Sequence, residues 1–314
     1  MEKRFITYLG FGRGGIRTLD IVEKNIENAD YMVCDTDDFH LRKSKIKNKI
    51  LLTKETTSSI SKKSIEAFEL LMEGRFVVFF VGSLGGESGS LLLPELLQVC
   101  NKLKIRTVCV LSKPFHFEGT IKKEISDKSE RLIRELATSV LVLENETCRE
   151  LCSTLRLENA FHTSHHYLAR ICKHFEVIIC EPGQLCIDFA ELLYVLRLSA
   201  KTIISDGIST GNERLLTAFQ NACTSPLFSS HPISNFDKIF MYYQCSSTQT
   251  IQMDEIKQIH QIIQELPNAT IIWNFSINEN LDDKKIHSLI DKIAESYINE
   301  IKSIEEDITK TRVF

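Results

Sequence analysis

The chain lacks several features that would define its class at once. It has no uninterrupted apolar run near the roughly 20 residues that a membrane span needs, so we expect no insertion into a bilayer. It has no CxxC pair, no internal repeat and no low-complexity linker. Most of its ten cysteines lie in apolar segments, where a free thiol behaves as a small hydrophobe. These absences exclude a disulfide scaffold and a repeat architecture, and they indicate a cytoplasmic protein.

The chain also has no large excess of positive or negative charge. The 314 residues carry 38 Lys and Arg against 42 Asp and Glu, a net charge of -4. Nothing in this balance steers the whole surface toward nucleic acid or anionic lipid, so we expect no nucleic-acid partner. The hydrophobic share of 43% is typical of a soluble protein with a sizeable core. The first residues enter a predicted strand at once, and we therefore expect no signal peptide.

The first two-thirds of the chain alternates strand-like and helix-like segments. Five runs are apolar almost throughout: 4–10, 30–36, 75–82, 104–111 and 139–145. Amphipathic stretches lie between them: 15–28, 59–73, 91–103 and 122–137. Such runs suit strands of a parallel sheet that is buried on both faces. The pattern predicts a doubly wound α/β domain, in which ligands bind at the carboxyl ends of the strands.

A long helix and a smaller α/β unit are predicted to follow. The helix covers 147–181, and the second unit has these elements: a helix at 188–199, a strand at 202–205, a helix from Gly211 to before Pro226, a strand at 238–245, a helix at 252–266 and a strand at 269–275. Residues 283–308 repeat apolar side chains at helical spacing. They predict an amphipathic helix that packs on the second domain or on a partner protein. We expect domains at 1–181, 182–282 and 283–314.

Two glycine-rich turns follow predicted strands and open predicted helices. The first is Gly10–Gly15, and the second is Leu84–Ser90. Glycines let backbone N–H groups approach phosphate oxygens, and a helix N-terminus favours the negative charge. One such turn would also suit a dehydrogenase, with Asp35 on the ribose. Two turns at neighbouring strand ends, without any GxxxxGK[ST] motif, predict a di- or triphosphate site instead.

Six motifs between residues 10 and 228 resemble those of FtsZ in their order. They are GFGRGG, CDTDDFHLRKS, LGGESGSLLLPELL, VLSKPFHFEG, EPGQLCIDFAEL and ISTGNERLLTAFQNACTSPLF. The fourth, which matches the family pattern VVTKPFxFEG, is highly specific. The chain is therefore identified as a divergent member of the FtsZ/tubulin superfamily. This resemblance implies a guanine-nucleotide-binding protein that uses GTP or GDP with Mg²⁺ and assembles with copies of itself, head to tail.

The resemblance also implies roles for individual residues. The phosphate turns correspond to Gly12, Arg13, Gly14, Gly15, Gly86, Glu87, Ser88 and Gly89. Glu118 falls where the family holds the ribose hydroxyls, a task suited to a carboxylate acceptor. Lys122 replaces a phosphate-side arginine; it keeps the charge but loses the bidentate fork. Phe161 falls where an aromatic ring stacks on the base, and His165 stands where an acidic or amide side chain would read the guanine edge.

Hydrolysis in the family is assembled between subunits, and the resemblance assigns it here to Asp188 and Glu191. Carboxylates of one subunit position and polarise water against the terminal phosphate held by the next. The two acids lie three residues apart at the start of a predicted helix, so they share roughly one face. Without the resemblance, both would be interpreted as acids that complement the helix dipole.

Several departures from the family pattern shape the expected function. Glu87 replaces the third glycine of the second turn, and residues 56–64 replace a glycine-rich loop over the terminal phosphate. A neutral His165 offers a single acceptor, so we expect weaker base discrimination. The predicted helix at 283–308 takes the place of the family's last strand, and we expect the family's flexible linker and terminal peptide to be absent. These features favour a specialised paralogue over the main division protein.

Two other functional classes stay open at this point. A non-hydrolysing scaffold of the same fold would act through the 283–308 helix, and Glu87 favours it. A nicotinamide-dependent oxidoreductase needs only the first glycine turn and leaves the KPFHFEG motif unexplained. His162 and His166 have the i, i+4 spacing of a metal pair, but no third ligand stands out in the sequence, so we assign no metal site.

Overall fold

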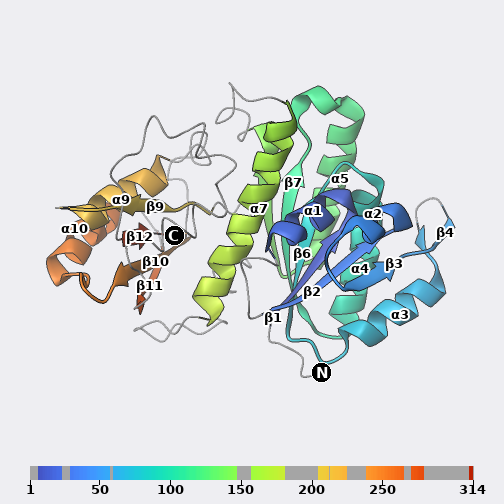
Figure 1. Ribbon diagram of the computed structural model, residues 1–314, viewed down its shortest axis with the longest axis horizontal. Helices are drawn as coiled ribbons and strands as arrows, with labels where there is room; N and C mark the ends of the chain where they lie inside the picture. The colour runs from blue at the N-terminus through green and yellow to red at the C-terminus, as the bar shows by residue number, and fades with distance from the viewer. Residues whose placement is uncertain are drawn as a thin grey trace. The chain divides into compact units, whose positions relative to one another are not determined.

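The computed structural model describes residues 6–22, 29–56, 59–146, 157–180, 204–211, 213–224, 238–264, 270–278 and 311–313. These residues fall into two compact units, one that runs up to Glu176 and one that takes in the described residues from Val177 onward (Figure 1). Each unit has its own sheet and its own apolar core. None of the described helices combines the length and the apolar character needed to cross a lipid bilayer.

The first unit is built on a six-stranded parallel sheet of order β3-β2-β1-β6-β7-β8. Its strands are β1 (Ile6–Phe11), β2 (Ala29–Asp35), β3 (Asn48–Leu51), β6 (Val77–Ser83), β7 (Arg106–Lys113) and β8 (Ser139–Glu144). All six residues of β1 are buried, as expected for a strand covered on both faces. The doubly wound α/β fold that the sequence predicts is therefore confirmed. Because β1 pairs in parallel with both β2 and β6, the carboxyl ends of the three strands reach one edge.

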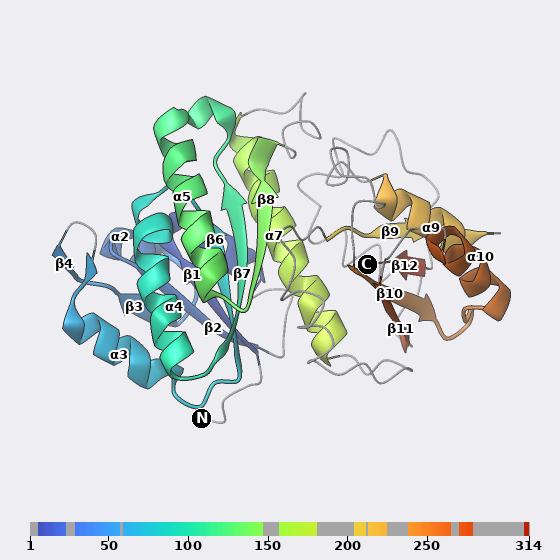
Figure 2. The same cartoon turned by 180° about the vertical axis from the view of Figure 1, so that it is seen from behind.

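Helices cover both faces of this sheet. They are α1 (Gly12–Val22), α2 (Asp38–Lys43), α3 (Lys62–Met72), α4 (Leu93–Lys102), α5 (Thr120–Leu136) and α7 (Leu157–Cys180). Figures 1 and 2 show α1 and α7 on one face and α3, α4 and α5 on the other. The hydroxyl of Tyr8 donates to the carbonyl of Cys172 over 2.8 Å, and the rings of Phe79 and Phe175 lie 5.1 Å apart. Helix α7 is thereby held against β1 and β6.

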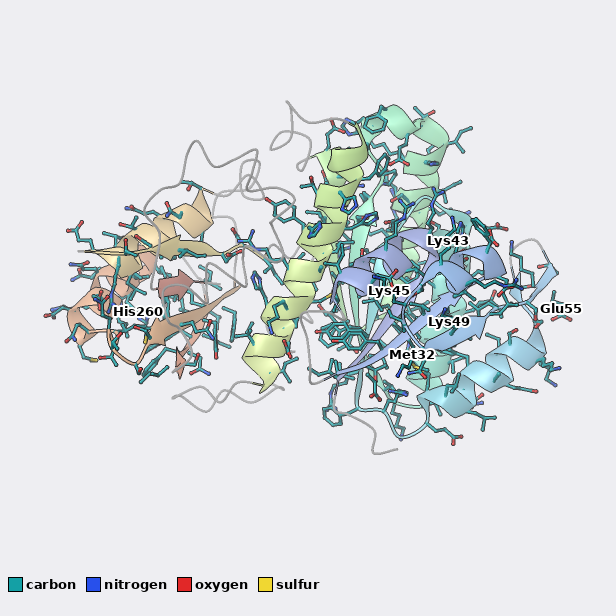
Figure 3. The ribbon with its side chains drawn as sticks, in the orientation of Figure 1. Met32, Lys43, Lys45, Lys49, Glu55 and His260 are labelled. Carbon is teal, nitrogen blue, oxygen red and sulfur yellow. The ribbon has the colours of Figure 1, made fainter. Side chains whose placement is uncertain are left out.

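Between α2 and α3 the chain forms elements that the sequence pattern did not predict. Strand β3 adds an edge to the sheet, and β4 (Lys54–Thr56) pairs with β5 (Ser59–Ile60) in a small antiparallel hairpin. The helix predicted over 59–73 therefore begins later, at Lys62, where the Ser61 side chain accepts from the backbone N–H of Ser64. Lys45 lies between α2 and β3, and Lys49 is on β3 (Figure 3). Lys49 is exposed, and a charged side chain on an edge strand opposes pairing with another strand.

The second unit has a four-stranded sheet of order β11-β10-β12-β9. Its elements are β9 (Gly207–Ser209), α9 (Arg214–Cys223), β10 (Lys238–Ser246), α10 (Met253–Gln264), β11 (Thr270–Asn278) and β12 (Thr311–Val313). Strands β10 and β11 are parallel, whereas β12 runs antiparallel to both β10 and β9. Leu215 and Phe219 of α9 pack with Tyr243 of β10 and Ile259 of α10 in the apolar core.

Two details of this unit differ from the sequence-based expectation. Of the strand predicted at 202–205, residues 202 and 203 lie outside the described residues, and residues 204 and 205 are not in a strand. Strand β9 lies further along, at Gly207–Ser209, where Gly207 packs directly on α9: an added Cβ would lie 1.9 Å from the carbonyl oxygen of Ala218. The end of the chain, expected as a short tail, contains β12. The helices predicted at 188–199 and 283–308 lie outside the described residues, so both stay predictions.

Candidate functional site

The carboxyl ends of the central strands surround a cavity of about 450 Å³ in the first unit. Both glycine-rich turns line it, because β1 and β6 are neighbours and end in register, with Phe11 opposite Gly82. The predicted site residues that line it are Gly12, Arg13, Gly14, Gly86, Glu87, Ser88, Gly89, Glu118, Lys122, Phe161 and His165. The fold thus brings together residues that are up to 153 positions apart in the sequence.

The first glycine turn needs its glycines for two different reasons. Gly12 has φ +63, a conformation that residues with a side chain rarely adopt, and it lines the cavity. Gly15 does not line the cavity. A Cβ there would lie 2.2 Å from the carbonyl oxygen of Val81, so Gly15 lets α1 pack closely on β6. The phosphate contact expected of Gly15 therefore has no support from its place in the structure.

The second glycine turn is held in shape by its own serines. The hydroxyl of Ser90 accepts from the backbone N–H of Gly85 over 2.7 Å. An added Cβ at Gly89 would lie 2.3 Å from the carbonyl oxygen of Ser83, whereas Gly86 faces open space. The residues that follow form one π-helical segment, Ser88–Leu92, which leads into α4. Free backbone N–H groups at such a helix start favour an anionic ligand.

Asp35, at the end of β2, contacts both the second glycine turn and α2. Its Oδ1 accepts from the hydroxyl of Ser88 over 2.8 Å and from the backbone N–H of Thr36 over 2.7 Å. Its Oδ2 lies 2.9 Å from Nδ1 of His40 in α2. Both carboxylate oxygens are thus engaged within the protein. Asp35 fixes the second turn, and its side chain is only 3% exposed, so little of it is left for the ribose contact that a dehydrogenase would require.

Helix α7 supplies the aromatic wall of the cavity. Phe161 meets the ring of Phe115 edge-on at 5.2 Å and that of Phe117 at 6.2 Å. His165, one turn further along the helix, is buried. Burial, with the nearby charges of Arg17, His162, His166 and Arg13, lowers its pKa from 6.5 to about 3. His165 is therefore neutral at physiological pH, and it presents one donor and one acceptor.

Glu118 and Lys122 lie together at another part of the wall. Oε1 of Glu118 accepts from the backbone N–H of Phe115 over 2.9 Å, and its Oε2 accepts from Nζ of Lys122 over 3.0 Å. The Glu118 side chain is 16% exposed and that of Lys122 is 50% exposed. The carboxylate is thereby oriented by its own backbone, and Lys122 retains N–H groups that can face an anion.

Sequence reasoning missed seven polar residues of the cavity wall. They are Arg17, Thr36, Asp37, His40, Ser83, Asn145 and Ser164. Asn145 directly follows β8, and it accepts a hydrogen bond from the hydroxyl of Ser164. Its position after a buried strand was a usable signal, because ligands bind at strand ends. His40 gave no such signal, because only the fold brings α2 to the cavity.

The two predicted catalytic acids are not part of this description. Asp188 and Glu191 lie outside the described residues, as does Cys186 in the same motif. Their roles stay predictions. Among the described residues, the carboxylates that line the cavity are Asp35, Asp37, Glu87 and Glu118.

Comparison with known sequences gives one family and a set of related proteins. Residues 5–153 match the profile of the "Tubulin/FtsZ family, GTPase domain". The chain is 24% identical over 294 residues to the cell division protein FtsZ of Buchnera aphidicola subsp. Baizongia pistaciae, which covers 88% of this chain and 76% of that protein. It is 25% identical over 296 residues to cell division protein FtsZ 1 of Archaeoglobus fulgidus, with 90% and 80% covered.

Solved structures share the fold. An FtsZ dimer from M. jannaschii, described as empty, superposes with a TM-score of 0.77 at 23% identity, over 99% of this chain and 87% of that one. CetZ2 from Haloferax volcanii, described as a GTPγS-bound protofilament, gives a TM-score of 0.71 at 13% identity, over 96% of this chain and 100% of that one.

Proposed function

Because this chain is a divergent FtsZ-like member of the FtsZ/tubulin superfamily, we propose that it binds guanine nucleotides and assembles head to tail into filaments. The observation that carries the proposal is the cavity between the two glycine-rich turns. The turns supply backbone N–H groups for phosphates, Glu118 supplies an oriented acceptor for ribose hydroxyls, and Phe161 supplies a ring for the base. Departures such as Glu87 and His165 favour a specialised paralogue.

We propose that Mg²⁺ enters the site bound to the phosphates of the nucleotide. Magnesium at phosphate sites is held by one or two carboxylates together with phosphate oxygens and water. Asp37 could supply the carboxylate of the protein. Its side chain lines the cavity and is 54% exposed, and one of its oxygens accepts from the backbone N–H of Phe39. In the described part of the chain, no group of three or more His, Cys, Asp or Glu side chains could hold an ion.

Assembly and hydrolysis are proposed to depend on each other. Asp188 and Glu191 of one subunit would complete the site of the next, where a carboxylate orients and polarises the attacking water. The structure of CetZ2 as a GTPγS-bound protofilament motivates the head-to-tail arrangement. In this arrangement the two acids belong to the end of the subunit opposite its own cavity.

The nucleotide content of the purified protein tests the first half of the proposal. The protein is denatured, and the released nucleotide is identified by chromatography. We expect GTP or GDP, and calorimetry of the nucleotide-free protein with Mg²⁺ should give guanine-nucleotide binding. A chain that binds no guanine nucleotide in either assay would disprove the function.

The dependence of turnover on concentration tests the second half. If the site is shared, GTP turnover per subunit should rise with protein concentration and vanish below the critical concentration for polymerisation. Subunits with Asp188→Ala and an intact cavity, mixed with subunits that have an intact Asp188 and a blocked cavity, should regain turnover. Mixtures that co-assemble yet stay inactive would contradict the shared site. Binding without any turnover would support the non-hydrolysing scaffold, which the glycine replacement at Glu87 favours.

A further inference from the structure

The second glycine turn carries an acid where a polyphosphate would be expected to repel it. Glu87 lies between Gly86 and Ser88 and lines the cavity, with its side chain 52% exposed. Such a carboxylate adds one negative charge beside the phosphates, and an unpaired one would weaken their binding. The structure gives Glu87 a counter-charge. Nζ of Lys54 donates to Oε1 of Glu87 from the hairpin β4–β5.

The hairpin that carries Lys54 is fixed to the body of the unit. The backbone N–H of Thr53 donates to the hydroxyl of Ser64 over 3.0 Å. At the other side of the hairpin, the backbone N–H of Ile60 donates to the carboxylate of Glu95, in the first turn of α4, over 3.1 Å. Lys54 therefore comes from a segment tied to α3 and α4, and its position is not that of a freely moving surface lysine.

The direction of Lys54 also separates it from its neighbour. Glu55, the next residue of β4, lies at the outer edge of the unit (Figure 3). Successive side chains on a strand point to opposite sides, and the Lys54 side chain, 29% exposed, reaches the rim of the cavity. Lys122, which does line the cavity, already pairs with Glu118.

Glu87 also stands at the start of a helix, where an acid complements the helix dipole, and exposed ion pairs contribute little to stability. This placement explains Glu87 alone. It does not explain why the hairpin β4–β5, tied to α3 and α4, supplies a lysine to the one acid in the phosphate turn.

We propose that Lys54 is a positioning residue of the phosphate site: it neutralises Glu87 and so makes this turn compatible with a nucleoside triphosphate. The inference rests on the proposed function. The ion pair of Lys54 with Glu87 explains how a phosphate turn that contains an acid can still bind a polyphosphate. Loss of Lys54 should therefore act through Glu87, and removal of Glu87 should make Lys54 dispensable.

Calorimetric affinities for GTPγS, measured with Mg²⁺ on the full chain, test this dependence. Lys54→Met should weaken binding about tenfold, the order expected for one unpaired charge several Å from a phosphate. Lys54→Arg should keep wild-type affinity. The double variant Lys54→Met with Glu87→Gln should return to within about twofold of wild type. Lys102→Met, which breaks an ion pair with Glu69 at the far end of α4, is the matched control and should leave affinity unchanged.

Each remaining outcome has a definite meaning. Unchanged affinity in Lys54→Met, with an unchanged circular dichroism spectrum, would show a surface ion pair only and overturn the inference. A loss that persists in the double variant would show that Lys54 does not act through Glu87, which also overturns it. Absence of GTPγS binding by the wild type would instead reject the proposed function, so the two failures are distinguishable.

Discussion

The neutral state of His165 gives a quantitative prediction about stability. Its pKa in the folded chain is lowered from 6.5 to about 3, first by burial and then by the charges of Arg17, His162, His166 and Arg13. Below pH 6.5 the unfolded chain binds a proton that the folded chain does not. The contribution of neutral His165 to the free energy of unfolding is therefore complete above pH 6.5 and is lost as the pH falls toward 3. The loss is about 1.4 kcal/mol per pH unit, or about 2 kcal/mol between pH 7.5 and pH 5.

Urea unfolding of the wild type and of His165→Asn, followed by circular dichroism at pH 7.5 and pH 5, measures this term. The wild type should lose about 2 kcal/mol more than the variant over this range, because asparagine does not titrate. His116→Asn, at a side chain that is 65% exposed, is the matched control and should follow the wild type. Equal losses in the wild type and in His165→Asn would refute the reasoning. So would an imidazole NMR titration of His165 near pH 6.5.

Three further changes have definite expected outcomes. Gly89→Trp should abolish guanine-nucleotide binding in calorimetry, because even a Cβ at this position would lie 2.3 Å from the carbonyl oxygen of Ser83 beside the cavity. Asp188→Ala should keep nucleotide binding, lose turnover and give filaments that persist in sedimentation, because the triphosphate at each interface is not cleaved. Arg214→Met should lower the free energy of unfolding of the second unit by about 3–5 kcal/mol, followed by fluorescence of the single tryptophan, Trp273. The guanidinium is buried and pairs with both oxygens of Glu255 at 3.0 and 3.3 Å.

Matched variants separate these effects from general damage. Met253→Trp adds an indole at a position that is 83% exposed and should leave nucleotide binding intact. Arg42→Met breaks an exposed pair with Asp38 and should cost no more than about 1 kcal/mol. Full nucleotide affinity in Gly89→Trp, wild-type turnover in Asp188→Ala, or a cost in Arg214→Met no larger than in Arg42→Met would each contradict the corresponding prediction.

Much of the first unit could be predicted from the sequence because its signals are local. A strand buried on both faces must be apolar at almost every position, so a run such as 75–82 can be recognised as a strand from its composition alone. Glycines that follow such a strand mark a turn where the backbone lies close to a ligand or to another backbone segment. Gly12 and Gly89 fulfilled this expectation at the cavity. The KPFHFEG motif added Glu118, whose place in the wall follows from the same short segment.

Short elements and long-range pairings could not be predicted in the same way. Strand β12 has three residues, too few for any period to appear, and it forms because β9 and β10 offer partners on both sides. The sequence marked Gly15 as a phosphate residue, but its environment is the backbone of Val81. Distinguishing a glycine needed for packing from one needed for a ligand requires knowing which strand lies behind it.

The sequence by itself determined five of the six strands in the sheet of the first unit, the two glycine-rich turns and the resemblance to FtsZ, because each depends on a run of consecutive residues. Only the tertiary structure decided how the charges of the cavity are balanced. Asp35 is fixed by Ser88 and His40, and Lys54 neutralises Glu87 from 33 positions away. Electrostatic interactions depend on distance in space and on burial, and neither quantity is encoded in the order of neighbouring residues.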